Sequence, residues 1–271
     1  FGKTDLNGIL SDSIPICGVM GDSQAALFAQ RCFSPGEAKV TLGTGSSVLL
    51  NIGNQLQYSH NGLLTAIGWV YQGQPTYAFE GIINYAGATI VWLRDQLELL
   101  RSSAETEVLS LSVEDNGGVY LVPAFVGLNA PYWRSDIKAA ILGLSPSTTR
   151  AHIARAAVES IAYQIKDVLE LMAGDAQTEL TMIRGDGGAV RNKFLMQFIA
   201  DLSSIIARAS ELPELSALGA VFAGTLGMGI YSSLDELAQI PTTFTDYAPQ
   251  MDKATANKLY AGWQSAVQQI L

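Results

Sequence analysis

The sequence is poor in the residues that build metal clusters and disulfide frameworks. Its 271 residues include only two cysteines, Cys17 and Cys32, and two histidines, His60 and His152. A structural zinc site needs four such ligands close together, whereas these four are scattered along the chain. Both cysteines lie in or beside apolar runs, so we interpret them as reduced thiols that pack in the interior. We expect no metal site built by this chain alone.

Charge is also scarce, and basic residues are the scarcer kind. Only 15% of the residues are charged, and 25 acidic side chains against 16 basic ones give a net charge of -9. Nucleic acids and anionic membrane surfaces bind basic faces, so we expect neither as a partner. An acidic protein can still bind a phosphorylated ligand through backbone N–H groups.

Long apolar runs are missing, although 48% of the residues are hydrophobic. Glycines and polar residues interrupt every run well before the ~20 residues that a membrane-spanning helix requires. No secretory signal is visible at the first residues. The composition therefore favours a globular protein with a sizeable core, and we expect it in the cytoplasm.

Several common catalytic motifs are absent. The chain has no G-x-x-x-x-G-K-[ST] loop, and no G-x-G-x-x-G sequence opens a helix after a first strand. H-E-x-x-H and G-x-S-x-G are also missing, which leaves metalloproteases and α/β-hydrolases unsupported.

Three glycine-rich turns at expected strand ends remain to be explained. They are Gly21-Asp22-Ser23, Gly43-Thr44-Gly45-Ser46-Ser47 and Gly185-Asp186-Gly187-Gly188-Ala189. Each turn alone is ordinary, because Gly and Asp are common in turns of every kind. Together they indicate that the backbone approaches a ligand at several points. Glycine has no Cβ, so N–H groups and the Thr44 hydroxyl could reach a phosphate closely.

The arrangement of elements indicates an α/β domain with a mixed sheet. We expect a short buried strand over 14–20, a hairpin over 38–52 and a second strand pair over 62–81, followed by a helix over 83–100. Strand–loop–helix units come later, with a helix from about 149 to 172. Asp22 would then begin a helix, where a carboxylate can simply cap the first turn. Gly87 inside the 83–100 helix costs ~1 kcal/mol relative to Ala, which suggests close approach of another group.

Eight segments, in the same order along the chain, resemble the C-terminal half of the FGGY-type carbohydrate kinases, with the glycerol kinases as the nearest members. The segments include GDSQAALFAQ, AKVTLGTGSSVLLNIG, VPAFVGLNAPYW and GDGGAVRNKFLMQFIAD. The resemblance implies an actin-like, ribonuclease H-like ATPase domain. It also implies phosphoryl transfer from ATP, with Mg²⁺, to a sugar or polyol hydroxyl.

The resemblance implies roles for particular residues. Asp22 matches the catalytic base that accepts the proton of the attacking hydroxyl, and a carboxylate at a strand end beside a phosphate site suits phosphoryl transfer. The nucleotide-binding positions match a γ-phosphate loop, a helix that faces the nucleotide and an adenosine turn, in that order: Gly43, Thr44 and Gly45; Gly87 and Ile90; Gly188 and Asn192. Two of them have simpler explanations, because Gly87 also suits plain helix packing and Asn192 also suits a solvent-facing position.

Two departures leave the substrate open. In the glycerol kinases a Gln follows the catalytic Asp and an aromatic residue stands at the position of Ser47, whereas this chain has Ser23 and Ser47. We expect Asp22, Ser23 and Ser47 to contact the substrate, with room for a longer polyol. The alternative is a ketose kinase of the xylulose or ribulose type. A non-catalytic actin-like ATP-binding module is a third possibility, but such a module has no use for a base at Asp22.

The largest difference between this chain and the members of that family is its length. Family members carry an N-terminal domain that supplies most sugar contacts, a first phosphate loop and a metal-coordinating Asp, and nothing similar precedes Phe1. We therefore expect residues 1–271 to be the C-terminal, nucleotide-binding domain, inactive without its missing N-terminal partner. Self-association into a homo-oligomer is compatible with the sequence.

Overall fold

A seven-stranded mixed sheet forms the centre of the computed structural model, which describes all residues from 1 to 271. The strands lie side by side in the order β11-β10-β9-β3-β4-β6-β5. Their bounds are β3 (Ala38–Leu42), β4 (Ser46–Gly53), β5 (Leu64–Tyr71), β6 (Gln74–Ile83), β9 (Met182–Asp186), β10 (Ile206–Ser210) and β11 (Phe244–Tyr247). β3, β9 and β10 run parallel to one another, and every other neighbouring pair is antiparallel.

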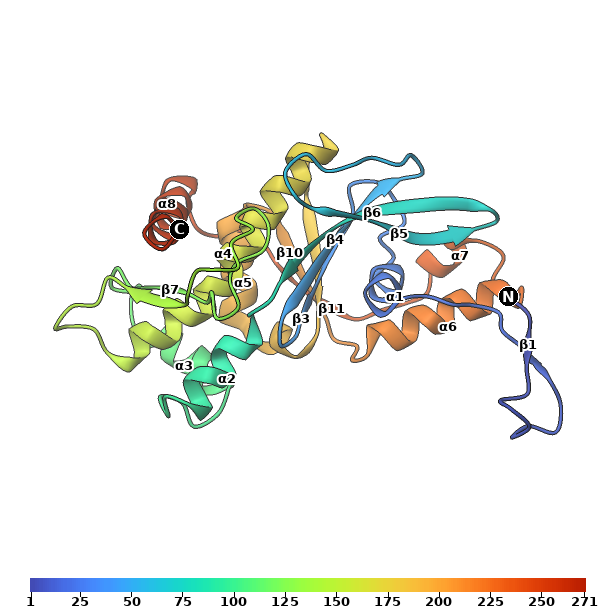
Figure 1. The fold of residues 1–271 in the computed structure, drawn as a ribbon, viewed down its shortest axis with the longest axis horizontal. Helices are drawn as coiled ribbons and strands as arrows, with labels where there is room; N and C mark the ends of the chain where they lie inside the picture. The colour runs from blue at the N-terminus through green and yellow to red at the C-terminus, as the bar shows by residue number, and fades with distance from the viewer.

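Helices cover both faces of this sheet (Figure 1). The helices are α1 (Asp22–Ala29), α2 (Gly87–Asp95), α3 (Glu105–Leu111), α4 (Arg150–Ala176), α5 (Lys193–Ser203), α6 (Leu215–Gly227), α7 (Leu234–Ala238) and α8 (Lys253–Gln268). α4 and α5 pack on one face, with α8 outside them, whereas α1 packs on the other face and α6 lies against α1. None of the helices is both long enough and apolar enough to cross a membrane.

The alternation of side chains along the strands separates the core into two parts. Val48 and Leu50 of β4 join the large apolar cluster beneath α4, while Leu49 between them joins a small cluster with Phe28 of α1 and Phe222 of α6. Successive residues of a strand point to opposite faces, so one hairpin supplies both layers. The α/β fold with a mixed sheet between helices is as the sequence predicts.

Short elements complete the molecule around this framework. The pairs β1 (Lys3–Thr4) with β2 (Ile14–Pro15) and β7 (Tyr120–Val122) with β8 (Ala140–Leu142) form two small antiparallel sheets. A 3₁₀ turn, η1 (Gly188–Arg191), joins β9 to α5.

Two expected elements are wrong in extent. The buried strand over 14–20 is reduced to Ile14–Pro15, and the side chains of Ile14, Ile16 and Val19 are exposed. The helix over 83–100 begins only at Gly87 and ends at Asp95, because Ile83 still belongs to β6. In both places an apolar run carries the sequence signal without specifying which element buries it.

Candidate functional site

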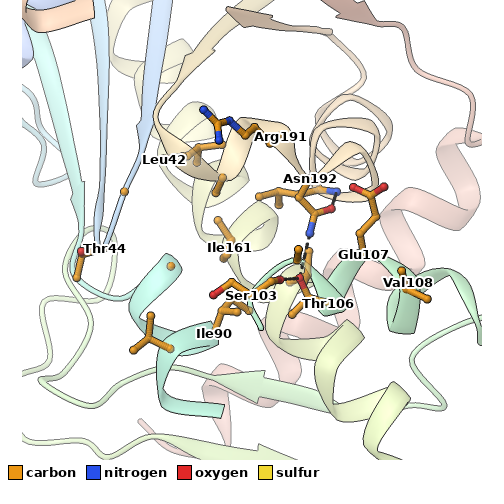
Figure 2. Close-up of a pocket in the computed structure, with 18 residues that line it drawn as sticks. Leu42, Thr44, Ile90, Ser103, Thr106, Glu107, Val108, Ile161, Arg191 and Asn192 are labelled. Atoms are coloured by element: carbon orange, nitrogen blue, oxygen red, sulfur yellow. Dashed lines mark hydrogen bonds between the residues drawn. The ribbon is translucent and has the colours of Figure 1, made fainter. Parts of the chain in front are cut away.

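A cavity of about 520 Å³ opens where the end of β3 meets α2, α3, α4 and η1. Figure 2 shows residues from all of these elements around one space, with Thr44 and Ile90 on one side and Asn192 on the other. Its lining residues are Leu42, Gly43, Thr44, Gly87, Ile90, Val91, Ser103, Ala104, Thr106, Glu107, Val108, Val158, Ile161, Gly188, Ala189, Arg191, Asn192 and Leu195. Six of the seven expected nucleotide-binding residues belong to this set, and only Gly45 does not.

The β3–β4 loop is tied by its backbone to the start of α2. The Gly43 carbonyl accepts the Gly87 N–H at 3.0 Å. The Thr44 carbonyl accepts the N–H groups of Ala86 at 3.0 Å and of Ala88 at 2.9 Å. These bonds satisfy donors at the helix start that have no partner within the helix. The loop and α2 therefore form one rigid corner of the cavity.

The glycines of this corner allow that close approach. A Cβ on Gly87 would lie 2.6 Å from the Gly43 carbonyl oxygen, and a Cβ on Gly45 would lie 2.6 Å from the Ile83 carbonyl oxygen. Both distances are too short for any other residue type to fit without displacing backbone. The group that approaches Gly87 is the loop backbone, so the packing of a second helix is not what Gly87 accommodates.

The turn after β9 forms the opposite wall. Gly187 has a φ of +90°, and a Cβ there would lie 2.5 Å from the Leu42 carbonyl oxygen, so this turn rests directly on the end of β3. A Cβ on Gly188, by contrast, would meet no atom within 4 Å. The two glycine segments are thus held against each other, with open space at Gly188.

Asn192 is part of this wall and not a solvent-facing residue. Its Oδ1 accepts the Leu195 N–H at 3.0 Å, which caps α5, and its Nδ2 donates to Thr106 Oγ1 at 3.2 Å. Glu107 of α3 also binds this region, because its carboxylate accepts the Lys193 N–H at 2.7 Å. α3 and its three lining residues, Thr106, Glu107 and Val108, were not predicted from the sequence, since a short polar helix leaves little periodic signal.

The three expected substrate residues lie outside the cavity lining. Asp22 is the first residue of α1, is exposed, and accepts the Ser23 N–H through Oδ1 at 2.6 Å. The contact is with a first-turn N–H group, although the N-cap residue of α1 is Gly21 and Asp22 is already inside the helix. α1 packs on the face of β3 and β4 opposite α4.

Ser47 lies on the α1 face of the sheet, near charged residues that the sequence analysis did not single out. Its Oγ donates to Glu80 Oε1 at 3.1 Å. Lys39 of β3 and Asp186 of β9 are buried on the same face. Asp186 is the last residue of β9 that pairs with β3, and Lys39 lies two residues before Thr41, the partner of Asp186 in that last pair. Inward-facing charges in otherwise apolar strands are the signal that could have identified them.

No group of three or more His, Cys, Asp or Glu side chains is placed to hold a metal ion. Glu107 is the one carboxylate in the cavity lining, and Arg191 the one cation. Elsewhere the lining consists of apolar side chains, hydroxyls and backbone, which suits a flat apolar group with a charged tail.

A mixed sheet between helices, with glycine loops meeting at a cavity beside the central strands, is the architecture of the actin-like ATPase fold. The chain belongs to the FGGY family of carbohydrate kinases, whose C-terminal domain model matches residues 38–228. Glycerol kinase 1 of Thermotoga maritima is 49% identical over all 271 residues, which are 55% of that protein's length. Glycerol kinase of Xylella fastidiosa strain M23 is 46% identical over the same span, 54% of its length.

Solved structures agree with this assignment. The crystal structure of Plasmodium falciparum glycerol kinase with ADP superposes with a TM-score of 0.90 at 36% identity, covering 98% of this chain and 53% of that one. A ligand-bound xylulose kinase from Lactobacillus acidophilus shares the fold, with a TM-score of 0.79 at 17% identity, over 90% of this chain and 49% of that one. The chain thus spans about half the length of the relatives it matches.

Proposed function

We propose that this chain is the nucleotide-binding half of an ATP-dependent polyol kinase that acts on glycerol or a close analogue. The observation that carries the proposal is the convergence of six expected nucleotide contacts, from three separate segments, on one cavity. The relatives at 45–49% identity are glycerol kinases, and the similar P. falciparum enzyme is described with ADP. Xylulose kinases resemble the chain only at the level of the fold.

The cavity suggests how the nucleotide would lie. Its apolar part, which includes Ile90 and Ile161, would receive the base, while Gly188 and Asn192 would contact the adenosine. The phosphates would extend toward Gly43, Thr44 and Gly45, where the two glycines let an anion approach the backbone and the Thr44 hydroxyl. Gly87 supports this placement by keeping α2 close to the loop.

The residues present fit a magnesium ion that arrives with the nucleotide. Mg²⁺ usually keeps several waters and binds through one or two carboxylates together with substrate phosphates, without a cage of protein ligands. Asp22 would accept the substrate proton, so the carboxylate that binds the ion would come from the N-terminal domain that we propose completes the enzyme. Bound there, the ion would neutralise charge on the transferred phosphate.

Asp22 would act as the general base. The substrate oxygen forms a bond to the γ-phosphorus while the bond from that phosphorus to the β-phosphate oxygen breaks, and the hydroxyl proton passes to the Asp22 carboxylate. The exposure of Asp22 leaves the carboxylate accessible to a substrate on the α1 side. Ser23 and Ser47 would border the substrate, and their small side chains would also admit a longer polyol.

The kinase activity would require a second domain. We propose that residues 1–271 act as the C-terminal domain and that an N-terminal substrate domain closes over Asp22 and Thr44, because phosphoryl transfer needs water excluded from the reacting groups. The oligomeric state of the chain can be measured by light scattering.

Calorimetric titration with Mg-ATP tests the nucleotide site. We expect the chain to bind Mg-ATP, and Thr44→Val to weaken binding by about tenfold, equivalent to ~1.4 kcal/mol. Thr181→Val is the matched control, because Thr181 is exposed at the opposite end of β9 and should leave the affinity unchanged. Absence of binding by the unaltered chain, with or without an added N-terminal domain, would refute the proposal.

A further inference from the structure

Lys39 is a cation enclosed in the sheet. None of its surface is exposed, and it lies on the α1 face of β3 because its neighbours Ala38 and Val40 join the apolar cluster on the other face. Its Nζ donates to Thr41 Oγ1 at 2.9 Å, and no carboxylate oxygen lies within 4.0 Å of it. Burying an ammonium group without an ion pair is costly, so its position calls for an explanation.

The surroundings of Lys39 contain a second buried charge, the Asp186 carboxylate. Asp186 is the register partner of Thr41 on the adjacent parallel strand β9. The neighbouring Thr41 side chain favours the ionised form of Asp186 and lowers its pKa, and Gln30 Nε2, at the end of α1, donates to Asp186 Oδ2 at 3.2 Å. Thr41 therefore lies between the ammonium that it binds and the carboxylate beside it, and Gln30 connects the carboxylate to α1.

Each charge makes the burial of the other less costly. Burial lowers the pKa of Lys39, and the carboxylates of Asp186 and then Glu80 oppose that shift, with smaller contributions from Cys32 and Asp22. Burial raises the pKa of Asp186, and the Lys39 ammonium is the largest opposing influence. Removal of either charge would leave its partner enclosed and uncompensated.

This charged group stands where both glycine segments of the cavity begin. Thr41 is two residues before Gly43, and Asp186 directly precedes Gly187. Between them, Gly187 packs so closely on the end of β3 that a Cβ would lie 2.5 Å from the Leu42 carbonyl oxygen. Any relative movement of the ends of β3 and β9 would therefore alter the cavity.

We propose that Lys39 is a positioning residue, which through Thr41 and Asp186 holds the β3–β4 loop and the turn after β9 in a fixed relation across the nucleotide cavity. The side chain lies on the α1 face and does not line the cavity, so it acts through the strand ends. The role in nucleotide binding rests on the proposed function, whereas the role in holding the two loops does not.

Hydrogen exchange on the unliganded chain tests the holding role. Lys39→Met keeps the length of the side chain and removes the charge. We expect it to speed amide exchange at least tenfold in peptides covering Gly43–Ser47, Ala86–Ala88 and Gly187–Asn192, and to leave α4 and α8 protected. Lys166→Met is the matched control, since Lys166 is a half-buried cation on α4 that pairs with Glu170 far from these loops.

Changes at Thr41 separate positioning from general stability. Thr41→Val removes the hydroxyl that links the two charges and should reproduce the local acceleration of exchange, while Thr41→Ser keeps the hydroxyl and should match the unaltered chain. Unchanged loop exchange in Lys39→Met would overturn the proposal. Loss of protection throughout that variant, together with unchanged exchange in Thr41→Val, would also overturn it by showing a purely structural role.

Nucleotide titrations then connect the loops to function. In Lys39→Met we expect the affinity for Mg-ATP to fall about tenfold and that for adenosine to fall less, because adenosine contacts only the turn after β9, whereas Mg-ATP must contact both loops at once. If the unaltered chain binds no nucleotide while the exchange results hold, the proposed function fails and the positioning role of Lys39 remains. Equal losses for both ligands would contradict a role at the phosphate loop.

Discussion

The spacing between Gly87 and the Gly43 carbonyl leaves no room for a methyl group. Ala is the better helix former by ~1 kcal/mol, so in open space Gly87→Ala would stabilise α2. Here the new Cβ would lie 2.6 Å from a backbone oxygen, and the loop must shift to relieve the contact. We expect Gly87→Ala to weaken Mg-ATP binding at least fivefold, measured by calorimetry.

Gly174→Ala provides the comparison for this prediction. Gly174 lies near the end of α4, and a Cβ there would meet no atom within 4 Å. We expect this variant to raise the free energy of unfolding by about 0.5–1 kcal/mol and to leave nucleotide affinity unchanged. If Gly87→Ala behaved in the same way, the loop and α2 would not be packed as described.

Asp167 supplies a pH-dependent prediction. Its buried carboxylate accepts hydrogen bonds from Tyr132 Oη at 3.1 Å, Trp263 Nε1 at 3.0 Å and Tyr260 Oη at 2.6 Å. Burial raises the pKa of Asp167 to about 6, although these three donors favour the ionised form. In the unfolded chain the pKa returns to about 3.9.

Between these two pKa values the folded chain binds more protons at Asp167 than the unfolded chain does. The free energy of unfolding therefore decreases as pH rises from about 4 to 6, by roughly 3 kcal/mol at most from this group. Asp167→Asn does not titrate, so the stability difference between the unaltered chain and this variant should shrink across that window in urea titrations. Parallel stability curves for the two proteins would show that Asp167 does not titrate there.

Individual residues of the cavity were predictable where the signal is local. Gly87 stands out because a glycine inside an expected helix suggests a steric reason from the sequence alone, and the 2.6 Å between its Cβ position and the Gly43 carbonyl oxygen supplies that reason. Lys39 and Asp186 did not stand out, since their significance comes from the pairing of β3 with β9, nearly 150 residues apart in the chain. Such long-range pairings leave no trace in the spacing of residues.

At the scale of elements, Arg155 fastens the segment after α3 to α4. Its Nη1 donates to the carbonyls of Ser110 at 3.2 Å, Val113 at 2.8 Å and Glu114 at 2.9 Å, and its Nε pairs with the buried Glu159 at 2.7 Å. Arg155→Met would leave the Glu159 carboxylate enclosed without its cation. We expect a loss of about 3–5 kcal/mol in the free energy of unfolding, measured by urea denaturation.

Arg94→Met is the matched control for this loss. Arg94 pairs with Asp95 at 2.5 Å, but both side chains are more than a third exposed, and exposed pairs contribute little. We expect a change below about 1 kcal/mol. Equal losses in the free energy of unfolding for Arg155→Met and Arg94→Met would mean that leaving the buried Glu159 carboxylate without its cation costs no more than breaking an exposed pair.

The errors in element boundaries have a common cause. The apolar residues from Ile83 to Leu100 recur at helical spacing, yet β6 includes Ile83 and only Gly87–Asp95 is helical. A pairing partner on β4, Ser46, decides that Ile83 is a strand residue, and helical periodicity contains no information about that partner. The prediction of a buried strand over 14–20 was wrong for a similar reason, because several of its apolar side chains are exposed in this chain.

At the scale of the whole molecule, the exposed position of Asp22 predicts a division of labour between two domains. The chain spans 55% of Thermotoga maritima glycerol kinase 1 and contains the proposed nucleotide cavity, but Asp22 is exposed to water. We expect the chain alone to bind Mg-ATP without steady-state phosphorylation of glycerol. Adding residues that precede the matched region in that relative, as a separate polypeptide, should restore turnover in a coupled ADP assay.

Asp22→Asn in this reconstituted pair decides whether the restored turnover uses the proposed base. A missing general base typically costs 10²–10⁴-fold, so kcat should fall by about that factor while the affinity for Mg-ATP stays unchanged, because Asp22 lies outside the cavity lining. Undiminished turnover by Asp22→Asn would leave the chain a nucleotide-binding module without a catalytic base. Xylulose and ribulose as acceptors in the same assay compare the substrates directly, and the larger space left by the small Ser23 and Ser47 side chains should show as low discrimination against acceptors longer than glycerol.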